Sequence, residues 1–207
     1  MEKFKTEQES FWAGGFGGEY VDRNIFEGLL ENNIAFFVKL FAHMARVSSV
    51  VEFGANVGMN LRAIQQLLPE AELSAVELND KAVVGLRQLH DVEVFHQSVL
   101  DFTPTRVWDL VLIKTVLIHI NPEMLPQVYD LLVQSAKRYI CVAEYYNPTP
   151  VEVSYRGHSG KLFKRDFAGE MLDRYENLRL VDYGFCYHRD NYFPQDDITW
   201  FLLEKLT

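Results

Sequence analysis

The sequence has few cysteines, and both of them lie in apolar surroundings. Cys141 falls within 139–143 and Cys186 within 181–187, and each of these segments reads as a buried strand. We interpret both cysteines as reduced core residues rather than as a disulfide or a catalytic thiol. Two cysteines without neighbouring histidines do not make a zinc site, so we expect no metal. Reduced cysteines make the cytoplasm the default location.

The sequence also lacks a long hydrophobic run and an excess of basic residues. No stretch approaches the ~20 apolar residues of a membrane-spanning helix, and the charged start of the chain is unlike a signal peptide. Lys and Arg number 20 against 29 Asp and Glu, which gives a net charge of −9. A mostly acidic surface repels nucleic acid and anionic lipid, so we expect neither as a partner. A local basic patch can still bind a small anion.

The apolar residues, 48% of the chain, alternate between two periodicities. One set of segments has strand-like character: 49–53, 73–78, 92–95, 107–114 and 138–143. Another set has helical spacing: 25–46, 61–68, 80–89 and 121–133, the last opened by Asn121 and Pro122. Strands that alternate with helices predict an α/β fold with a parallel sheet covered on both faces.

The end of the chain departs from this alternation. Residues 178–187 and 198–204 are two strand candidates with no helix between them, and they predict an antiparallel pair at the sheet edge. A mostly parallel sheet that ends in a C-terminal antiparallel hairpin resembles the Rossmann-like class I methyltransferase fold. A simple dinucleotide-binding fold does not need that ending.

The strongest motif is 50–60, VVEFGANVGMN, in which an apolar strand is followed by a glycine turn and a helix. Gly54 allows a sharp turn and close approach of a ligand, and Gly58 allows the helix to start close to the strand. Free N–H groups at a helix start favour a carboxylate or phosphate. Glu52 offers an acceptor to an ammonium or a water. Glu77, which ends the second strand, can accept both hydroxyls of a ribose.

Three nucleotide-binding interpretations compete for this motif. A phosphate-binding P-loop needs a lysine after the last glycine, and none follows Gly58. A dinucleotide site needs glycines where Asn56 and Met59 stand, and these side chains would crowd a pyrophosphate. The pattern E-x-G-x-x-x-G with a distal glutamate instead resembles motif I of S-adenosylmethionine (SAM) enzymes. Asn56 replaces the middle glycine of that motif, and Asn tolerates a left-handed backbone, so the turn can survive.

This resemblance implies further cofactor contacts at the ends of later strands. Ser98 and Val99 would line the adenine, with Asp101 as an alternative contact or a turn cap. Asn79 would touch the adenosine or serve only as a turn residue. Lys114 closes the fourth strand and can reach the cofactor or the substrate.

Three other segments carry a closer resemblance: FWAGGFGGEYVDRN, EYYNPTPVEVSYRGHSGKLFKRDF and YHRDNYFPQDDITWFLLEK. Together with the motif, they look like the small methylases associated with pseudaminic acid biosynthesis. The resemblance implies one methyltransferase domain over 1–207, made of an N-terminal lid and helix (1–47), a SAM-binding core (48–145), and a substrate loop with the C-terminal hairpin (146–207). It assigns Tyr20 and Arg23 to a lid over the cofactor and Trp12 to the substrate. The alternative is that these aromatic residues only pack the N-terminal segment.

Candidate catalytic residues follow the fourth and fifth strands. His119 has an ordinary pKa suited to a general base, although it can instead pack on the helix that opens at Asn121. Tyr145 and Asp166 are further candidates. A carboxylate or phosphonate acceptor would need no base.

A basic segment, 155–166, follows the fifth strand. Arg156 can grip a carboxylate or phosphate with two parallel bonds, with Tyr155, His158 and Lys161 nearby. Glycines in the segment predict a mobile loop that closes over a ligand. A solvated basic loop is the alternative, and Lys164 and Arg165 fit it best because they precede a helix.

The leading hypothesis is therefore a SAM-dependent methyltransferase that acts on a small anionic molecule and releases S-adenosylhomocysteine. A non-catalytic nucleotide- or sugar-binding module and an NAD-dependent oxidoreductase stay open as alternatives. The sequence leaves open whether the protein is a monomer or a homodimer.

Overall fold

Short apolar segments form the strands of the structure, a computed structural model that describes residues 4–23 and 28–206. The chain forms two units, Met1–Phe102 with Asn191–Phe193 and Thr103–Asp190 with Pro194–Thr207. No helix in the described ranges is long and apolar enough to cross a bilayer.

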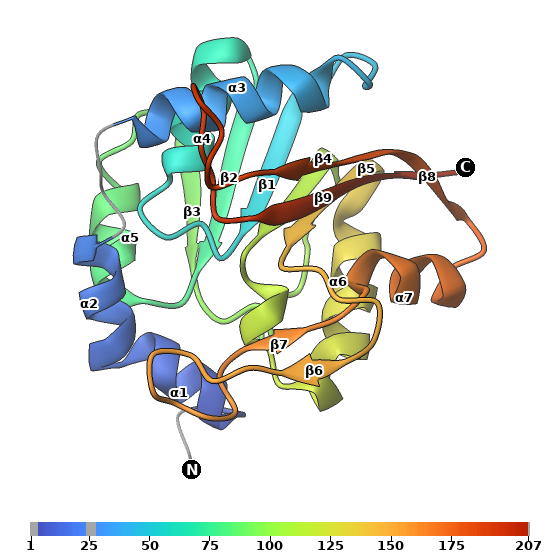
Figure 1. Ribbon diagram of the computed structural model, residues 1–207. Helices are drawn as coiled ribbons and strands as arrows, with labels where there is room; N and C mark the ends of the chain where they lie inside the picture. Colours follow the sequence, from blue (N-terminus) through green and yellow to red (C-terminus); the bar gives the residue numbers. More distant parts are fainter. Residues whose placement is uncertain (1–3, 24–27, 207) are drawn as a thin grey trace. The chain divides into compact units, whose positions relative to one another are not determined.

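The first unit has three parallel strands with helices between them (Figure 1). Its elements are α1 (Glu7–Ala13), α2 (Gly15–Arg23), α3 (Leu29–Phe41), β1 (Ser49–Phe53), α4 (Met59–Leu67), β2 (Glu72–Glu77), α5 (Asp80–Leu86) and β3 (Val92–His96). The strands are hydrogen-bonded in the order β3-β2-β1, with Val50 opposite Leu73 and Leu73 opposite Val92. β1 and most of β2 are buried, which explains their continuous apolar character.

The second unit combines a parallel strand pair with an antiparallel hairpin. Its elements are β4 (Trp108–Lys114), the 3-10 turns η1 (Leu117–His119) and η2 (Pro122–Met124), α6 (Leu125–Ser135), β5 (Ala136–Glu144), β6 (Val151–Glu152), β7 (Phe163–Lys164), α7 (Phe167–Arg174), β8 (Leu178–Cys186) and β9 (Ile198–Lys205). The strand order is β4-β5-β9-β8. β4 and β5 are parallel, whereas β9 is antiparallel to both β5 and β8.

Polar side chains cap several helices, and of these only the start at Asn121 was predicted from the sequence. The Asn79 carboxamide accepts the N–H groups of Lys81 and Ala82 at the start of α5. Asn121 accepts the N–H of Glu123, and Asp166 accepts the N–H of Gly169 at the start of α7. Each cap satisfies a backbone donor that has no partner within its helix.

The predicted strands and the C-terminal antiparallel pair are confirmed, and Cys141 and Cys186 form no disulfide within the described residues. Cys141 is fully buried, whereas Cys186 is only partly buried on β8. No secondary structure was predicted for the glycine-rich segment from Phe11, which forms the end of α1 and all of α2. The helix predicted over 25–46 is shorter in the structure, where it is α3, and residues 24–27 lie outside the described residues.

Candidate functional site

The turn after β1 has a left-handed backbone at three positions. The φ angles are +73° at Gly54, +49° at Asn56 and +78° at Gly58. Glycine adopts such angles without steric cost, and asparagine is among the few other residues that tolerate them. The expectation that Asn56 preserves the turn of the glycine motif is therefore confirmed for the backbone.

Glu77 organises this turn through its carboxylate. Its Oε2 accepts the N–H of Asn56 at 2.8 Å, and its Oε1 accepts the N–H groups of Leu78 and Asn79 at 2.8 and 2.7 Å. Burial raises the pKa of Glu77 and the three backbone donors oppose that rise. A carboxylate has about four lone-pair directions. Backbone N–H groups already use three of them, so one is left for the predicted contact with the ribose.

The side chains of the motif divide into engaged and unsatisfied groups. Glu52 is buried and accepts a hydrogen bond from the Asn60 carboxamide at 2.6 Å. Both Nδ2 and Oδ1 of Asn56 are buried, and neither has a hydrogen-bond partner within the described part of the chain. A buried amide without hydrogen bonds costs free energy. A polar ligand that bonds to the Asn56 carboxamide would remove this cost, so the turn suits such a ligand.

We expected Gly58 to allow a close contact between the helix and the preceding strand, whereas the residues closest to it are Leu86 and Leu89. A Cβ at this position would lie 2.5 Å from Cδ1 of Leu89 and 2.8 Å from Cδ2 of Leu86. The glycine therefore lets the start of α4 approach the end of α5. Its left-handed φ angle is a second reason for glycine here.

The N-terminal helices are attached to this loop region. The Asn79 Nδ2 donates to the Trp12 carbonyl at 2.9 Å, so both ends of its carboxamide are engaged by protein groups. The Trp12 ring packs edge-on against the Tyr20 ring at 5.2 Å, and Arg23 pairs with Glu19 at 3.3 Å. These contacts agree with the interpretation that the aromatic residues pack the N-terminal segment. The role of this segment as a lid stays a prediction.

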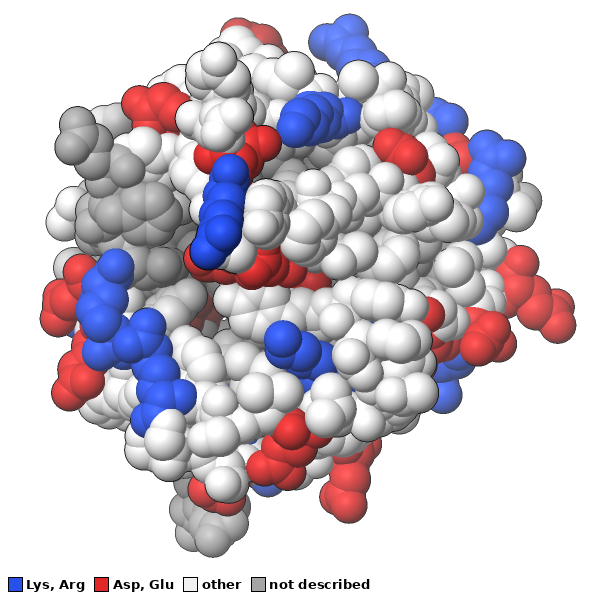
Figure 2. Space-filling model, in the orientation of Figure 1, with Lys and Arg blue, Asp and Glu red and all other residues white. Residues whose placement is uncertain are grey.

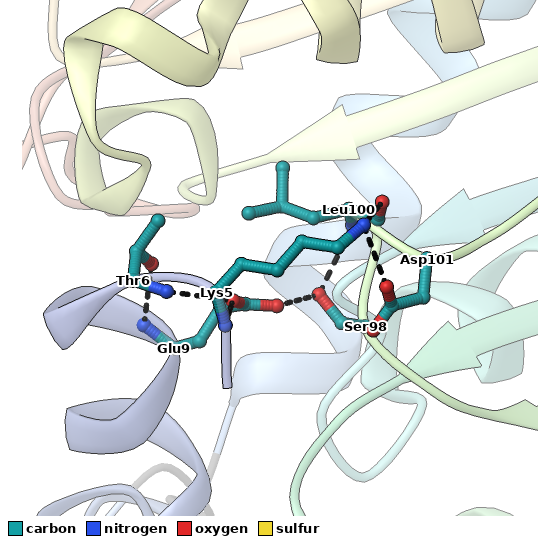
Figure 3. A network of polar contacts seen from close by, with 6 residues as sticks. All are labelled: Lys5, Thr6, Glu9, Ser98, Leu100 and Asp101. Atoms are coloured by element: carbon teal, nitrogen blue, oxygen red, sulfur yellow. Dashed lines mark hydrogen bonds and ion pairs between the residues drawn. The ribbon is translucent and has the colours of Figure 1, made fainter. Parts of the chain in front are cut away.

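The loop after β3 is attached to the N-terminal segment as well (Figure 3). The buried Ser98 hydroxyl donates to the Glu9 carboxylate, and Asp101 forms an ion pair with Lys5 at 2.7 Å. Val99, the other residue expected beside the adenine, is partly exposed. Ser98 is therefore engaged by helix α1, and Asp101 by Lys5, two residues before that helix.

In the second unit, His119 is a buried, neutral side chain. Its Nδ1 lies 2.6 Å from the Lys161 carbonyl, and because a carbonyl only accepts, Nδ1 carries the proton. Burial lowers the pKa of His119 to about 4. The expectation of an ordinary pKa suited to a general base is therefore wrong. The ring also packs against Tyr155, with 5.1 Å between ring centroids.

The basic segment is a β-hairpin, which we call the arm (residues 151–164), rather than an open loop (Figure 1). Strands β6 and β7 pair antiparallel, and further along the arm Tyr155 and His158 exchange two backbone hydrogen bonds of 2.8 and 2.9 Å. Arg156 and Gly157 form the tip with φ angles of +51° and +84°, which match a type I′ turn. Arg156 is exposed and lies over the Tyr155 ring at 6.0 Å.

The remaining cations of this segment differ in environment. Lys161 is buried, at 4% exposure, which does not fit the alternative of a solvated basic loop at this residue. The Lys164 ammonium lies 5.3 Å from the Tyr145 ring centroid. Arg165 pairs with Glu170 at 2.7 Å, and Asp166, a candidate base, caps α7. Arg165 and Asp166 thus have structural partners, while Arg156 forms no ion pair within the described residues.

Comparison with known proteins shows which fold contains these groups. No family model and no curated protein matches the chain. Solved structures do match over nearly its whole length. The plantazolicin methyltransferase BpumL, solved with S-adenosylhomocysteine, is 12% identical with a TM-score of 0.68 and 97% and 94% of the two chains covered. The 1,6-didemethyltoxoflavin-N1-methyltransferase of Burkholderia thailandensis is 16% identical with a TM-score of 0.68 and coverage of 97% and 87%. The magnesium protoporphyrin IX methyltransferase of Synechocystis PCC 6803 is 12% identical with a TM-score of 0.65 and coverage of 99% and 100%.

The chain has the class I methyltransferase fold. The α/β architecture predicted from the sequence, with its C-terminal antiparallel hairpin, is thereby confirmed. In this class I methyltransferase fold the motif turn, Glu77 and the loop after β3 lie in the first unit, and His119 and the arm lie in the second.

Sequence reasoning missed two buried acids of this class I methyltransferase fold. Glu144 ends β5, is 2% exposed, and accepts the N–H groups of Val116 and Leu117 at 2.9 and 2.8 Å. Burial raises the pKa of Glu144 to about 8 against these backbone donors. A signal existed, since Glu144 closes an apolar strand as Glu77 does. Glu9 gave no comparable signal beyond its place three residues after Thr6.

Proposed function

We propose that the protein is a SAM-dependent methyltransferase that methylates a small anionic molecule. The observation that carries the proposal is the left-handed turn from Gly54 to Gly58, tied to Glu77 by the Asn56 N–H, in a chain with the class I methyltransferase fold. The three structural neighbours named above carry methyltransferase names, and all three were solved with SAM or its product.

The residues of the first unit suit SAM as the cofactor. We assign Gly54, which has a left-handed backbone, to the methionine part, and the unsatisfied Asn56 carboxamide offers a donor and an acceptor. We assign Glu77 to the ribose through its remaining lone pair, and Ser98 and Val99 to the wall beside the adenine. Glu52, Gly58, Asn79, Tyr20 and Arg23 complete the cofactor contacts proposed in the first unit, and Lys114 of the second unit is assigned to the cofactor as well. When bound, SAM supplies a methyl group that is already activated, so the protein mainly positions the acceptor and excludes water.

The arm supports an anionic acceptor. Arg156 sits exposed at a hairpin tip whose backbone is fixed by two hydrogen bonds, and its guanidinium suits a carboxylate or phosphate. We assign Tyr155, His158, Lys161 and Trp12 to the same acceptor. The resemblance to pseudaminic acid-associated methylases fits a carboxylate-bearing sugar, and amino acids and phosphonates carry the same kind of group. Basic and acidic side chains are interspersed on the face drawn in Figure 2, which suits a small anion better than a long polyanion.

The state of His119 favours an acceptor that is already ionised. A histidine with a pKa near 4 is neutral at neutral pH but is a weak base, and its Nδ1 proton is committed to Lys161. A carboxylate or phosphonate oxygen attacks a sulfonium methyl without losing a proton. We therefore propose that His119 and Tyr145 orient the acceptor more than they remove a proton from it.

The structural neighbours do not select an acceptor, because their names span different chemistries. They include a plantazolicin methyltransferase, a 1,6-didemethyltoxoflavin-N1-methyltransferase and an amino pentose methyltransferase from Micromonospora echinaspora. A cytoplasmic location, and either a monomer or a homodimer, are part of the proposal.

The first test is calorimetric titration with SAM, S-adenosylhomocysteine and NAD⁺ in parallel. We expect binding of the first two and none of NAD⁺. Binding of NAD⁺ without SAM would instead support an oxidoreductase.

The second test is a methyl-transfer screen read by mass spectrometry, with each acid paired to its neutral amide or alcohol. We expect a gain of one methyl group on the acid of a pair. SAM binding without transfer to any acceptor would favour a non-catalytic module, and equal transfer to both members of a pair would contradict the anionic acceptor.

A further inference from the structure

The loop that follows β3 is held on two sides by the start of the chain (Figure 3). The Ser98 hydroxyl donates to Glu9, and the Leu100 N–H donates to the Ser98 oxygen at 3.0 Å. The Lys5 ammonium donates to the Leu100 carbonyl at 2.7 Å and pairs with Asp101 at 2.7 Å. Residues 5–9 thus contact three residues of the loop 98–101, through the side chains of Ser98 and Asp101 and the backbone of Leu100.

Glu9 is the central group of this network and has two separate tasks. Its Oε2 accepts the backbone N–H groups of Lys5 and Thr6 at 2.7 and 3.0 Å, which completes the capping box of α1. Its Oε1 accepts the Ser98 hydroxyl. Capping alone is achieved by exposed glutamates on many helices, whereas Glu9 is buried at 5% exposure. The burial therefore follows from the second task, the contact with Ser98.

Given the proposed SAM site, we propose that Glu9 is a positioning residue for cofactor binding, which braces loop 98–101 beside the adenine. The Ser98 hydroxyl has one proton, and that proton is given to Glu9. The hydroxyl is therefore a brace and not a donor to the adenine. The ring meets backbone atoms of the loop and the Val99 side chain.

The test measures the dissociation constant of SAM by calorimetry for the wild type, Glu9→Ala, Glu9→Gln, Ser98→Ala and the double alanine variant. We expect Glu9→Ala and Ser98→Ala each to weaken binding by at least about fivefold, because a buried charge-assisted hydrogen bond is lost. Since both changes break one contact, the double variant should bind about as weakly as either single variant. Glu9→Gln keeps an acceptor oxygen and should recover part of the affinity.

Glu7→Ala is the matched control, because Glu7 lies in the same first turn of α1, is exposed, and is absent from the network. It should leave SAM affinity unchanged. Hydrogen exchange adds a readout without cofactor: the amides of Leu100 and Asp101 should exchange faster in Glu9→Ala and Ser98→Ala than in Glu7→Ala. If Glu9→Ala does not fold, Glu9→Gln and Ser98→Ala decide the question.

Unchanged affinity in folded Glu9 and Ser98 variants would overturn this role, and so would tighter binding, which would mean that the contact competes with the cofactor. Fully additive losses would mean that Ser98 contacts the ligand itself. If the wild-type protein binds no SAM, both the proposed function and the role of Glu9 are contradicted. A wild type that binds SAM beside unaffected variants removes only the role of Glu9.

Discussion

Glu144 should make the protein less stable as the pH rises, and Glu144→Gln should remove that effect. The carboxyl is 2% exposed, and its Oε1 accepts the N–H groups of Val116 and Leu117. Glutamine has nearly the same shape, and its amide oxygen can accept the same two bonds. The substitution therefore removes a titrating group while preserving the local hydrogen bonds.

The magnitude follows from the pKa of Glu144, which burial raises from 4.5 to about 8. Between these two pH values the folded protein holds a proton that the unfolded chain has released, so folding becomes less favourable as the pH increases. The stabilising effect of this proton is fully present below pH 4.5 and is lost as the pH passes through about 8. At ~1.4 kcal/mol per pH unit, the whole change amounts to roughly 5 kcal/mol.

The assay is urea unfolding of the wild type and Glu144→Gln at pH 5, 7 and 9 at constant ionic strength. The free energy of unfolding of the variant minus that of the wild type should increase with pH, and most of the increase should fall between pH 5 and 8. Glu123→Gln, a change at an exposed acid of η2, should give a difference that stays nearly constant. A constant difference for Glu144→Gln as well would refute the argument that Glu144 is protonated in the folded protein.

Four further substitutions test the assignments of the two units. Glu77→Ala should weaken SAM binding by at least about tenfold and also lower the melting temperature, because Glu77 holds the motif turn as well as the proposed ribose; unchanged calorimetric affinity in a folded variant would contradict the ribose assignment. Gly54→Val should lower the free energy of unfolding in urea melts by roughly 1–2 kcal/mol, because valine is strained in a left-handed backbone, and should abolish SAM binding in calorimetry. If the loss of binding free energy were as small as the loss of unfolding free energy, Gly54 would be a structural turn only. Arg156→Ala should raise the KM of an anionic acceptor, or lower kcat, with SAM affinity nearly intact, and steady-state kinetics with unaltered parameters would argue for a solvated loop. His119→Phe should speed amide hydrogen exchange along the arm, since the bond to the Lys161 carbonyl is lost, and unaltered protection would show that the strand pairs alone hold the arm.

The sequence predicted the strands well because burial on both faces leaves a continuous apolar run. Residues 49–53 were expected to form a strand and do so with the same bounds. The helical start at Asn121 and Pro122 was also legible, since a polar residue followed by proline suits the first turn of a helix. These signals lie within a few residues of the element that they define.

The features that escaped prediction depend on contacts between distant segments. Glu9 is 89 residues from Ser98, and nothing near Glu9 in the sequence indicates that partner. The low pKa of His119 arises from burial and from the Lys161 carbonyl 42 residues away. The arm was read as a flexible loop because Gly157 suggests mobility, whereas beside Arg156 it supports the positive φ angles of a tight hairpin turn.

The crowding at Gly58 has a consequence for how this sequence can diverge. Two conditions exclude other residues there: a left-handed backbone, and the tips of Leu86 and Leu89 in the space that a Cβ would need. Moving the leucines would not relax the backbone, and relaxing the backbone would not move the leucines. No single substitution therefore relieves both the backbone strain and the clash with the leucines. Descendants of this chain should retain glycine at position 58. Position 56 has only the first condition, which leaves it open to drift between asparagine and glycine.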